Sequence, residues 1–462
     1  MPTLRPQDSA AQRADYVRQQ MPESGLFAGH EWRISPTPFP LGPRLAKDLE
    51  KLGRVLLQFY RATNLLYRKS AEGKLPEWVA NLLDQGKPSS LIALQRHEAF
   101  KHDVPRVIRP DILLTEEGFS ITELDSVPGG IGLTGWLNQT YQNSNNEFSE
   151  SAPTDSNSKR PEKGAIIGGG AGPVEGFSGI FDDKKRVQVI VSDESATYRP
   201  EMEWLADKIS PERDISVRNS TFEEFQKDDA VYRFFELFDL QNVANSEVLF
   251  RRASEQFLTL SPPPKAFLEE KLIFSLLWNR NLREFWHQEL GQGFLKTLLN
   301  HIPYSWTIDP TPLPPHAAYP ELGLTDWQQL KSLSQKERRL ILKISGFAPE
   351  AWGARGVHLG SDLSTEDWGT VVDRAIKVFD NNPHILQQFT KPRVVDSHYF
   401  DFETRSLIPM PGRVRLCPYY FVQGIGDQAR AKLGGCLATI CPADKKIIHG
   451  MSEAIMVPCS ID

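Results

Sequence analysis

The chain has 462 residues, of which 40% are hydrophobic, and its formal net charge is -6. This length predicts two to four domains with a large core, and the acidic balance argues against nucleic acid or an anionic membrane surface as a partner. The chain has no apolar run of about 18 residues, and its first residues, MPTLRPQDSAAQRADYVRQQ, lack an apolar signal core, so we expect a cytoplasmic protein without a membrane-spanning helix.

The cysteines show neither a metal-binding nor a catalytic pattern. None belongs to a Cys-x-x-Cys pair, and no histidine lies beside them at the spacing of a zinc site. No histidine-containing motif accompanies any of them, which argues against a catalytic thiol. We therefore expect reduced, mostly buried thiols at Cys417, Cys436, Cys441 and Cys459.

The N-terminal part is predicted to be an arm followed by a long helix. Residues 1–40 end in the proline-rich segment SPTPFPLGP, which is typical of extended backbone. Residues 44–70 repeat leucine at helical spacing, for example at Leu45, Leu49 and Leu52, so one side of this helix is apolar. Its expected role is packing.

The stretch RPDILLTEEGFSITELD, residues 109–125, is predicted to form two antiparallel strands joined by a tight turn. Asp111 begins the first strand, and Glu123 and Asp125 end the second, so pairing of the strands brings three carboxylates together. Carboxylate oxygens suit Mg²⁺ that is shared with phosphates. Arg109 lies on the same face as Asp111, where it can hold a phosphate or a substrate carboxylate.

A plain hairpin with solvated acidic side chains is the alternative interpretation of this stretch. The sequence Pro-Gly-Gly-Ile-Gly at 128–132 argues against it, because a glycine-rich segment lets the backbone approach a ligand closely. We therefore favour a binding site at the end of the hairpin.

A short helix at 133–141 and a flexible linker at 143–187 are predicted next. The first part of the linker is polar and has too few apolar residues to bury a core. Its later part, IIGGGAGPVEGF, also permits a phosphate-binding loop. It lacks Gly-Lys-Ser/Thr and a clear strand before it, so a linker is favoured.

A small α/β domain with a parallel sheet is predicted for the central region, because short apolar strands alternate there with a helical pattern. A second helix in this region is rich in aromatic residues and contains Lys271, a cation that can reach a ligand. The predicted strands and helices span 186–192, 198–209, 213–216, 229–234 and 268–289.

The C-terminal region contains a strand at 339–344 with one lysine, Lys343, among apolar residues. A buried lysine needs a partner. A glycine-containing loop follows at 345–360, with Gly353 and Gly356, and then a helix at 367–379. The next strand, 385–389, runs into Thr390-Lys391-Pro392, which breaks it. Further strands are predicted at 413–422 and 435–440.

These elements together predict a nucleotide site. A strand lysine can neutralise phosphates, and backbone N–H groups of a glycine loop can cover them. A strand that ends in a break can offer free backbone groups to an adenine edge, and a carboxylate cluster can hold Mg²⁺. Each element could also have a purely structural role, as a core lysine, a surface loop, a buried strand or a polar hairpin. Their joint occurrence favours the nucleotide site.

On these residues the sequence resembles the circularly permuted ATP-grasp ligases, the group that includes glutathionylspermidine synthase. The Arg-x-Asp and Glu-x-Asn elements of that family match Arg109-Pro110-Asp111 and Glu123-Leu124-Asp125, with Asp125 in place of the family's Asn. The lysine and loop match Lys343 and residues 345–360, and the hinge matches Gln387–Thr390. The resemblance implies an α/β fold of the circularly permuted ATP-grasp type, with two lobes around an ATP cleft and an additional small α/β domain.

The resemblance also implies a role for each candidate residue, with ATP and Mg²⁺ as cofactors. Asp111, Glu123 and Asp125 are expected to hold the metal. Arg109 is expected to bind the carboxylate or the transferred phosphoryl group, and Arg415 to be a second cation of the site or else a structural ion-pair partner. Expected nucleotide-binding residues are Lys343, Lys271, Gln387, Gln388, Phe389, Thr390, Gly353 and Gly356.

The activity implied is ligation of a carboxylate and an amine, both small molecules, through an acyl phosphate with release of ADP. Such chemistry needs positioning and charge neutralisation more than a protein nucleophile. A non-catalytic nucleotide-binding protein and an ATP-dependent phosphotransferase are the alternatives. The expected domains are 1–40, 41–142, 143–187 as a linker, 188–330 and 331–462.

Overall fold

The computed structural model describes residues 6–23, 31–148, 164–351, 356–445, 448 and 452–462. Its largest sheet contains β1 (Phe39–Leu41), β2 (Val107–Thr115), β3 (Gly118–Asp125), β12 (Val394–Val395), β15 (Gly412–Gln423), β16 (Arg430–Pro442) and β17 (Ile455–Ile461). The order is β1-β17-β16-β15-β2-β3, and β12 also pairs with β15. The β1–β17 pair is parallel, whereas the pairs that join β15 to β2 and β2 to β3 are antiparallel. The main sheet therefore combines strands from both ends of the chain.

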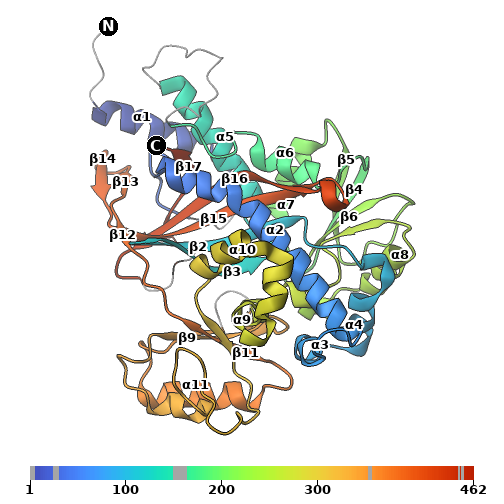
Figure 1. The fold of residues 1–462 in the computed structure, drawn as a ribbon. Coiled ribbons are helices and arrows are strands. Elements are labelled where there is room, and N and C mark those ends of the chain that lie inside the picture. Colours follow the sequence, from blue (N-terminus) through green and yellow to red (C-terminus); the bar gives the residue numbers. More distant parts are fainter. Residues whose placement is uncertain (1–5, 24–30, 149–163, 352–355, 446–447, 449–451) are drawn as a thin grey trace.

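One face of the main sheet is covered by α2 (Pro43–Ala71), against which α10 (Arg283–His301) packs. In Figure 1 both helices lie in front of the sheet. The apolar side of α2 is buried, which confirms the helix predicted at 44–70. The hydroxyl of Tyr420 on β15 donates to the carbonyl of Leu49 on α2 at 2.6 Å.

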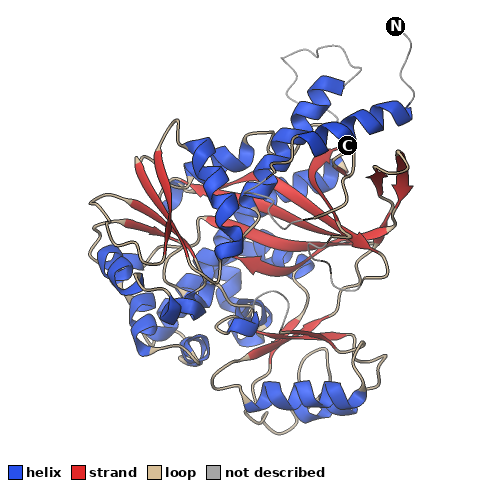
Figure 2. Cartoon of the chain, turned by 180° about the vertical axis from the view of Figure 1, so that it is seen from behind, coloured by secondary structure: helices blue, strands red, loops and turns tan. Residues whose placement is uncertain are grey.

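The other face of the main sheet carries α5 (Ile131–Phe148) and α6 (Gly172–Gly179). These helices are seen in front of the sheet when the molecule is viewed from behind (Figure 2). Tyr419, the strand neighbour of Tyr420, points to this face, and its hydroxyl donates to the carbonyl of Gly129 at 2.8 Å. The segment after the acidic hairpin therefore lies over this face.

A second sheet has the order β5-β4-β6-β7, and all its pairs are parallel. This confirms the parallel sheet predicted for the central region. Its strands and its two helices are β4 (Arg186–Val191), α7 (Arg199–Ile209), β5 (Asp214–Asn219), β6 (Ala230–Phe234), α8 (Ser246–Ser254) and β7 (Thr259–Ser261).

A third, smaller sheet has the order β10-β9-β11-β8 and is packed on α11 at the bottom of Figure 1. Three tryptophans form much of its core, at positions 306, 327 and 368. The strand β8 lies within the predicted domain 188–330, but it pairs with β11 of the predicted domain 331–462. The predicted domain boundaries did not anticipate this pairing. The elements are α9 (Leu272–Trp278), β8 (Ser305–Thr307), β9 (Leu340–Ile344), β10 (Val357–Leu359), α11 (Thr365–Lys377) and β11 (His384–Gln388).

The remaining elements lie at the edges of these three sheets. A two-stranded ribbon pairs β13 with β14, and α1 packs on α5. The N-terminal arm thus begins with a helix within the described residues. The bounds are α1 (Pro6–Gln19), α3 (Trp78–Asp84), α4 (Ser89–Arg96), β13 (His398–Asp401) and β14 (Ser406–Pro409).

Two predicted segments differ from the structure. The helix predicted at 268–289 is interrupted: α9 ends at Trp278, and α10 begins at Arg283 and has a kink at Gly291. The linker predicted at 143–187 is wrong for its described parts, because α5 continues to Phe148 and α6 packs on β15 and β16. The glycines that suggested flexibility instead permit close packing. Residues 149–163 lie outside the described part of the chain.

The glycine-rich segment packs so closely on β15 and β16 that side chains are excluded. A Cβ at Gly168, where φ is +81°, would lie 1.9 Å from the carbonyl oxygen of Gly434. A Cβ at Gly176 would lie 2.1 Å from the ring of Phe421, which is fully buried. The segment is therefore part of the core of this face rather than a phosphate loop.

We expect Gly176→Ala to lower the free energy of unfolding by about 1–3 kcal/mol, because the buried ring of Phe421 cannot move away without strain. Gly369→Ala on α11 is the control: its Cβ would meet only the Lys331 side chain, at 3.6 Å, so stability should stay equal or rise. Urea denaturation measures both, and equal stability of the two variants would contradict the close packing.

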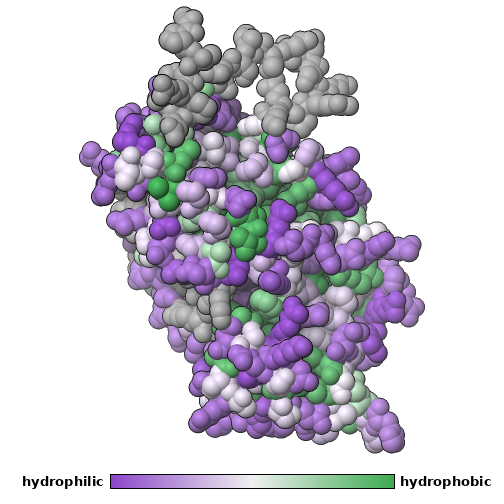
Figure 3. Space-filling model, turned by 90° about the vertical axis from the view of Figure 1, so that its left-hand side faces the viewer, coloured by the Kyte–Doolittle hydropathy of each residue, from purple (hydrophilic) through white to green (hydrophobic). Residues whose placement is uncertain are grey.

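Hydrophilic side chains cover most of the molecular face in Figure 3, and hydrophobic ones show in small patches between them. Among the described residues, no helix is long and apolar enough to cross a membrane. The four cysteines are buried and free of disulfides, as predicted.

Candidate functional site

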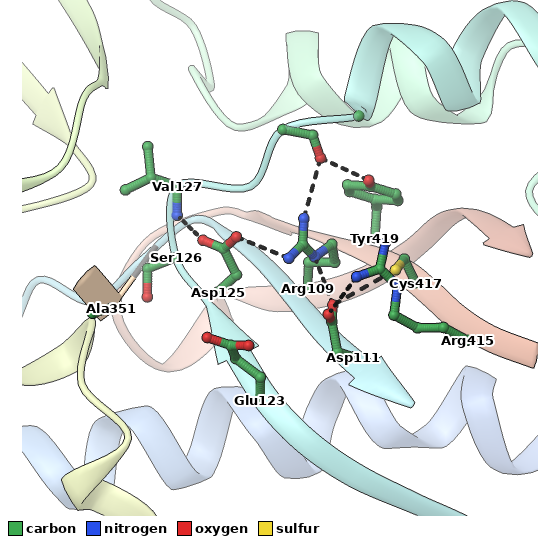
Figure 4. A network of polar contacts seen from close by, with 12 residues as sticks. Arg109, Asp111, Glu123, Asp125, Ser126, Val127, Ala351, Arg415, Cys417 and Tyr419 are labelled. Carbon is green, nitrogen blue, oxygen red and sulfur yellow. Dashed lines mark hydrogen bonds and ion pairs between the residues drawn. The ribbon is translucent and has the colours of Figure 1, made fainter. Parts of the chain in front are cut away.

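The acidic hairpin forms with the predicted pairing. Arg109 lies opposite Asp125 and Asp111 opposite Glu123, and the register shifts just after Asp111. The shift is an irregularity of the kind that bends a strand and re-aims side chains, and it lies directly beside the candidate residues. The four predicted side chains are thus brought to one end of the hairpin, as shown in Figure 4.

Arg109 joins two of the three carboxylates. Its Nε lies 3.1 Å from Asp111 Oδ1, and its Nη2 lies 3.0 Å from Asp125 Oδ2. The third nitrogen donates to the carbonyl of Gly129 at 3.3 Å. This guanidinium is only 17% exposed, so it offsets carboxylate charge that water screens weakly. Arg109 also anchors the glycine segment that follows the hairpin.

Asp111 is enclosed by cations. Arg415 Nη1 on β15 donates to Asp111 Oδ2 at 3.2 Å, and the thiol of Cys417 donates to Oδ1 at 3.6 Å. Burial alone would raise the pKa of Asp111, but Arg109 and Arg415 together hold that pKa below its ordinary value. Arg415 therefore forms an ion pair, which was the structural role predicted as the alternative to ligand binding.

A small pocket of about 50 Å³ opens beside Glu123 and Asp125, between the hairpin and the loop after β9. Two further carboxylates line it, from Glu236 and Glu269. Burial raises the pKa of Glu236 well above its usual range, and the charges of Glu269 and Asp125 raise it further. Burial likewise raises the pKa of Glu269, against the effect of its ion pair with Arg233.

Lys271 supplies the positive charge of this pocket. Its Nζ lies 2.6 Å from Glu123 Oε1 and 3.5 Å from the carbonyl oxygen of Ala351. The lysine side chain is 8% exposed. It comes from the turn before α9, so it connects the acidic strand to the loop of the small sheet.

Lys343 crosses from the small sheet to the hairpin. Its Nζ donates to the carbonyl of Thr122 on β3 at 3.0 Å and to Gln387 Oε1 at 2.8 Å. Burial lowers the pKa of Lys343 to about 8, although the charges of Glu123 and Asp111 act in the opposite direction. The prediction of a buried lysine with a partner is confirmed. Two lysines thus meet the last residues of the acidic strand.

The predicted adenine hinge is not arranged as expected. The backbone N–H groups of Gln388 and Phe389 donate to the carbonyls of Tyr304 and Arg339, so they are not free for an adenine edge. The reason is that β11 is an inner strand with β8 on one side and β9 on the other, and β8 was not foreseen. The side chain of Gln387 is also occupied, between Lys343 and Ser305. Thr390 accepts a hydrogen bond from Ser120 at 3.3 Å.

The loop after β9 is fixed at its beginning. Ser345 donates to Glu270, and Glu270 forms a fully buried ion pair with Lys87. Gly356 accepts a backbone hydrogen bond from Ile344 at 3.1 Å, and its position leaves no space for a Cβ. Gly353 lies outside the described residues.

The predicted carboxylate trio does not form a metal centre in this arrangement. Within the described ranges, no three His, Cys, Asp or Glu side chains are placed so that they could hold a metal ion together. Asp111 points to two arginines, whereas Glu123 and Asp125 line the pocket.

Sequence reasoning missed Glu201 of α7, which holds the glycine segment from the other side. Its carboxylate accepts from the N–H of Gly130 at 2.7 Å and from that of Leu133 at 3.4 Å, at the start of α5. Burial raises its pKa from 4.5 to about 7 in spite of these donors. Glu201 is one of three acidic residues in an amphipathic helix, and nothing in the sequence distinguishes it from the other two. The same holds for Glu236 and Glu269, which become site residues only through the fold.

We expect the stability of the protein to fall as the pH rises from about 5 to 7 through Glu201. The folded chain holds this proton to about pH 7, whereas the unfolded chain releases it near 4.5, so a higher pH in this interval favours unfolding. Glu201→Gln should flatten that part of the profile of urea midpoint against pH. Glu203→Gln, an exposed change on the same helix, should keep the parent's slope. Identical slopes in all three proteins would exclude Glu201 as the cause.

The fold is of the glutathione synthetase-like kind. A glutathione synthetase-like effector from Globodera pallida, solved in its apo form, matches 99% of this chain with 97% of its own, at a TM-score of 0.55 and 10% identity. A proposed γ-glutamylcysteine synthetase from Methylobacillus flagellatus KT matches 84% of this chain with 87% of its own, at 11% identity and a TM-score of 0.38, which is too low to support an argument. In sequence, no family model and no curated protein matches the chain. The likeness therefore defines the architecture alone.

Proposed function

We propose that this protein is an ATP-dependent carboxylate–amine ligase on a circularly permuted ATP-grasp fold. The observation that carries the proposal is the meeting of two lysines with the acidic strand. Lys343 on β9 and Lys271 before α9 both reach residues 122–123 of β3, across the boundary between two sheets. Cations from one lobe that face carboxylates of another suit a triphosphate with its metal.

The order of the elements supports the permuted type. In ordinary ATP-grasp proteins the lysine strand precedes the acidic metal strand. Here the acidic strand β3 comes first and the lysine strand β9 follows more than two hundred residues later, as the separation of 221 residues between Lys343 and Thr122 shows. The glutathione synthetase-like architecture agrees with such a ligase at the level of the fold.

The residues of the pocket fit Mg²⁺ that is shared with phosphates. Glu123 and Asp125 both line the pocket, and one or two carboxylates are what Mg²⁺ takes from the protein in sites of this kind. When bound, the metal would neutralise phosphate oxygens. Asp111 fits a different role, because two guanidinium groups enclose it. We assign it to the positioning of Arg109 and Arg415.

The remaining candidates have roles that follow from their places. Lys343 and Lys271 would bind phosphate oxygens, and Arg109, beside the carbonyl of Gly129, would orient the substrate carboxylate. The carboxyl groups of Glu236 and Glu269, whose pKa values burial raises, would accept hydrogen bonds from the amine substrate. Nucleotide contact by Thr390 and the glycine loop stays a prediction.

A non-catalytic nucleotide-binding protein is the second candidate, and one observation favours it. Asp111, Glu123 and Asp125 each have a cationic partner within the chain. Such pairs can serve structure alone.

Two measurements test the proposal. We expect the melting temperature to rise with Mg-ATP and much less with ATP plus a chelator, since a ligand at 100 times its dissociation constant stabilises a fold by about 2.7 kcal/mol. ADP release, screened over amino acids, peptides and polyamines, should require both a carboxylate and an amine. Stabilisation without ADP release would select the second candidate, and ADP release with one substrate alone would select a phosphotransferase. Equal melting in all conditions would contradict nucleotide binding.

A further inference from the structure

A larger pocket lies on the other side of the main sheet from the candidate site. Its volume is about 680 Å³. It lies between α2, α10 and the turn from β15 to β16, on the face toward which Tyr420 points. Arg109, Arg415 and Tyr419 belong to the opposite face. The main sheet thus separates the two hollows.

Three arginines from two elements line this pocket. Arg54 and Arg61 are seven residues apart on α2, which places them on one side of the helix. Arg430 begins β16 and donates to the carbonyls of Asp427 and Ala429. Arg61 donates to the carbonyl of Gly426 at 2.5 Å.

The pocket therefore keeps a surplus of positive charge, although the whole chain is acidic. No ion pair joins Arg54, Arg61 or Arg430 to a carboxylate within the described ranges. Of the two acidic residues in the lining, Glu289 lies 3.7 Å from Lys69, which offsets its charge. Guanidinium groups that no carboxylate occupies are suited to phosphate, which they bind through paired hydrogen bonds.

The lining also includes apolar side chains and an aromatic ring. Leu57 and Leu290 line the pocket, and the guanidinium of Arg54 lies over the ring of Phe294 at 5.4 Å. The kink at Gly291, with φ of 69°, turns α10 beside them. A flat apolar body can pack on these side chains while its charged end meets the arginines.

We propose that this pocket binds a small phosphate ester with a flat apolar body. Its volume is in the range of small-molecule sites, and its lining supplies both parts of the recognition. The site is independent of the proposed ligase activity because it lies on the opposite face of the sheet. It is a second ligand site on this fold.

The test uses 1-naphthyl phosphate in isothermal titration with the full chain. The parent should bind one equivalent, and Arg54→Met and Arg430→Met should each weaken binding by about tenfold or more. Arg44→Met, an exposed change on the same helix, should bind like the parent. 1-Naphthol and inorganic phosphate should both bind more weakly than the ester. Melting curves of the variants show that they are folded.

Several results would overturn the proposal. One is an absence of binding to the parent, and another is equal binding by the parent, Arg54→Met and Arg430→Met. A third is displacement of the probe by saturating Mg-ATP, which would place it in the site on the other face. Binding that persists in Lys343→Ala would support two separate sites, whatever the outcome for ligase activity.

Discussion

Arg109→Met is expected to lower the free energy of unfolding by about 3 kcal/mol, because removal of one partner leaves buried charge uncompensated. Asp111 and Asp125 both rely on this guanidinium. Asp125 also accepts a hydrogen bond from the N–H of Val127, and within the described residues Arg109 is the cation that pairs with it. Burial already raises the pKa of Asp125, so the variant should also bind extra protons on folding below neutral pH. Urea denaturation at pH 5 and pH 8 measures both effects, and the loss should be larger at pH 8.

The control is Arg405→Met. Arg405 forms a two-point pair with Asp15 at 2.8 and 2.9 Å, but the pair is exposed, and exposed pairs contribute little. Stability should hardly change. If Arg109→Met lowered the free energy of unfolding as little as this control, water would reach the Arg109 network freely. The electrostatic role of Arg109 in the site would then be small.

Glu123→Gln and Lys343→Ala are expected to damage different steps of the proposed reaction. Glu123 is placed to hold the metal that neutralises charge on the transferred phosphoryl group, so its loss should lower the rate of ADP formation by about 100-fold or more, with nucleotide binding partly kept. Lys343 reaches the same strand from the small sheet and would meet phosphates before the reaction as well. Its loss should weaken ATP binding itself.

The comparison pairs apo melting with ATP titration and ADP release. Glu117→Gln, at the exposed turn of the hairpin, is the control and should behave like the parent in all three. Loss of stability without ATP would indicate a structural role for either residue. Variants that melt, bind Mg-ATP and release ADP like the parent would remove both residues from the site and end the ligase proposal.

The hairpin could be predicted because its information is local. Alternating residues and a turn signal within 109–125 define the pairing, and the pairing alone places Arg109 and Asp125 together. The lone lysine of β9 was recognisable for the same reason, since charge within an apolar strand requires a partner. The choice of partners, Gln387 and Thr122, was not recognisable, because it depends on how two sheets meet.

The rest of the site depends on contacts between distant segments. Glu201 and Glu269 lie in ordinary helical or turn sequence. Only the packing of α7 brings Glu201 to the glycine segment, and only the fold brings Glu269 to the pocket. The prediction of an adenine hinge was wrong because of β8. This strand of three residues is too short to show a pattern in the sequence, yet it pairs with the side of β11 that does not contact β9. The prediction of a flexible linker at the glycine-rich segment 168–176 was wrong because composition cannot distinguish a flexible backbone from a tightly packed one.

The pairing of β2 with β15 determines how early during synthesis of the chain the candidate site can form. Asp111 and Arg415 are 304 residues apart in the chain, so the acidic hairpin stays without its sheet neighbour until most of the polypeptide has left the ribosome. The loop that must close is long, which slows such a step. A nascent chain that stops before β15 would have the acidic strand and both lysines but no scaffold to align them.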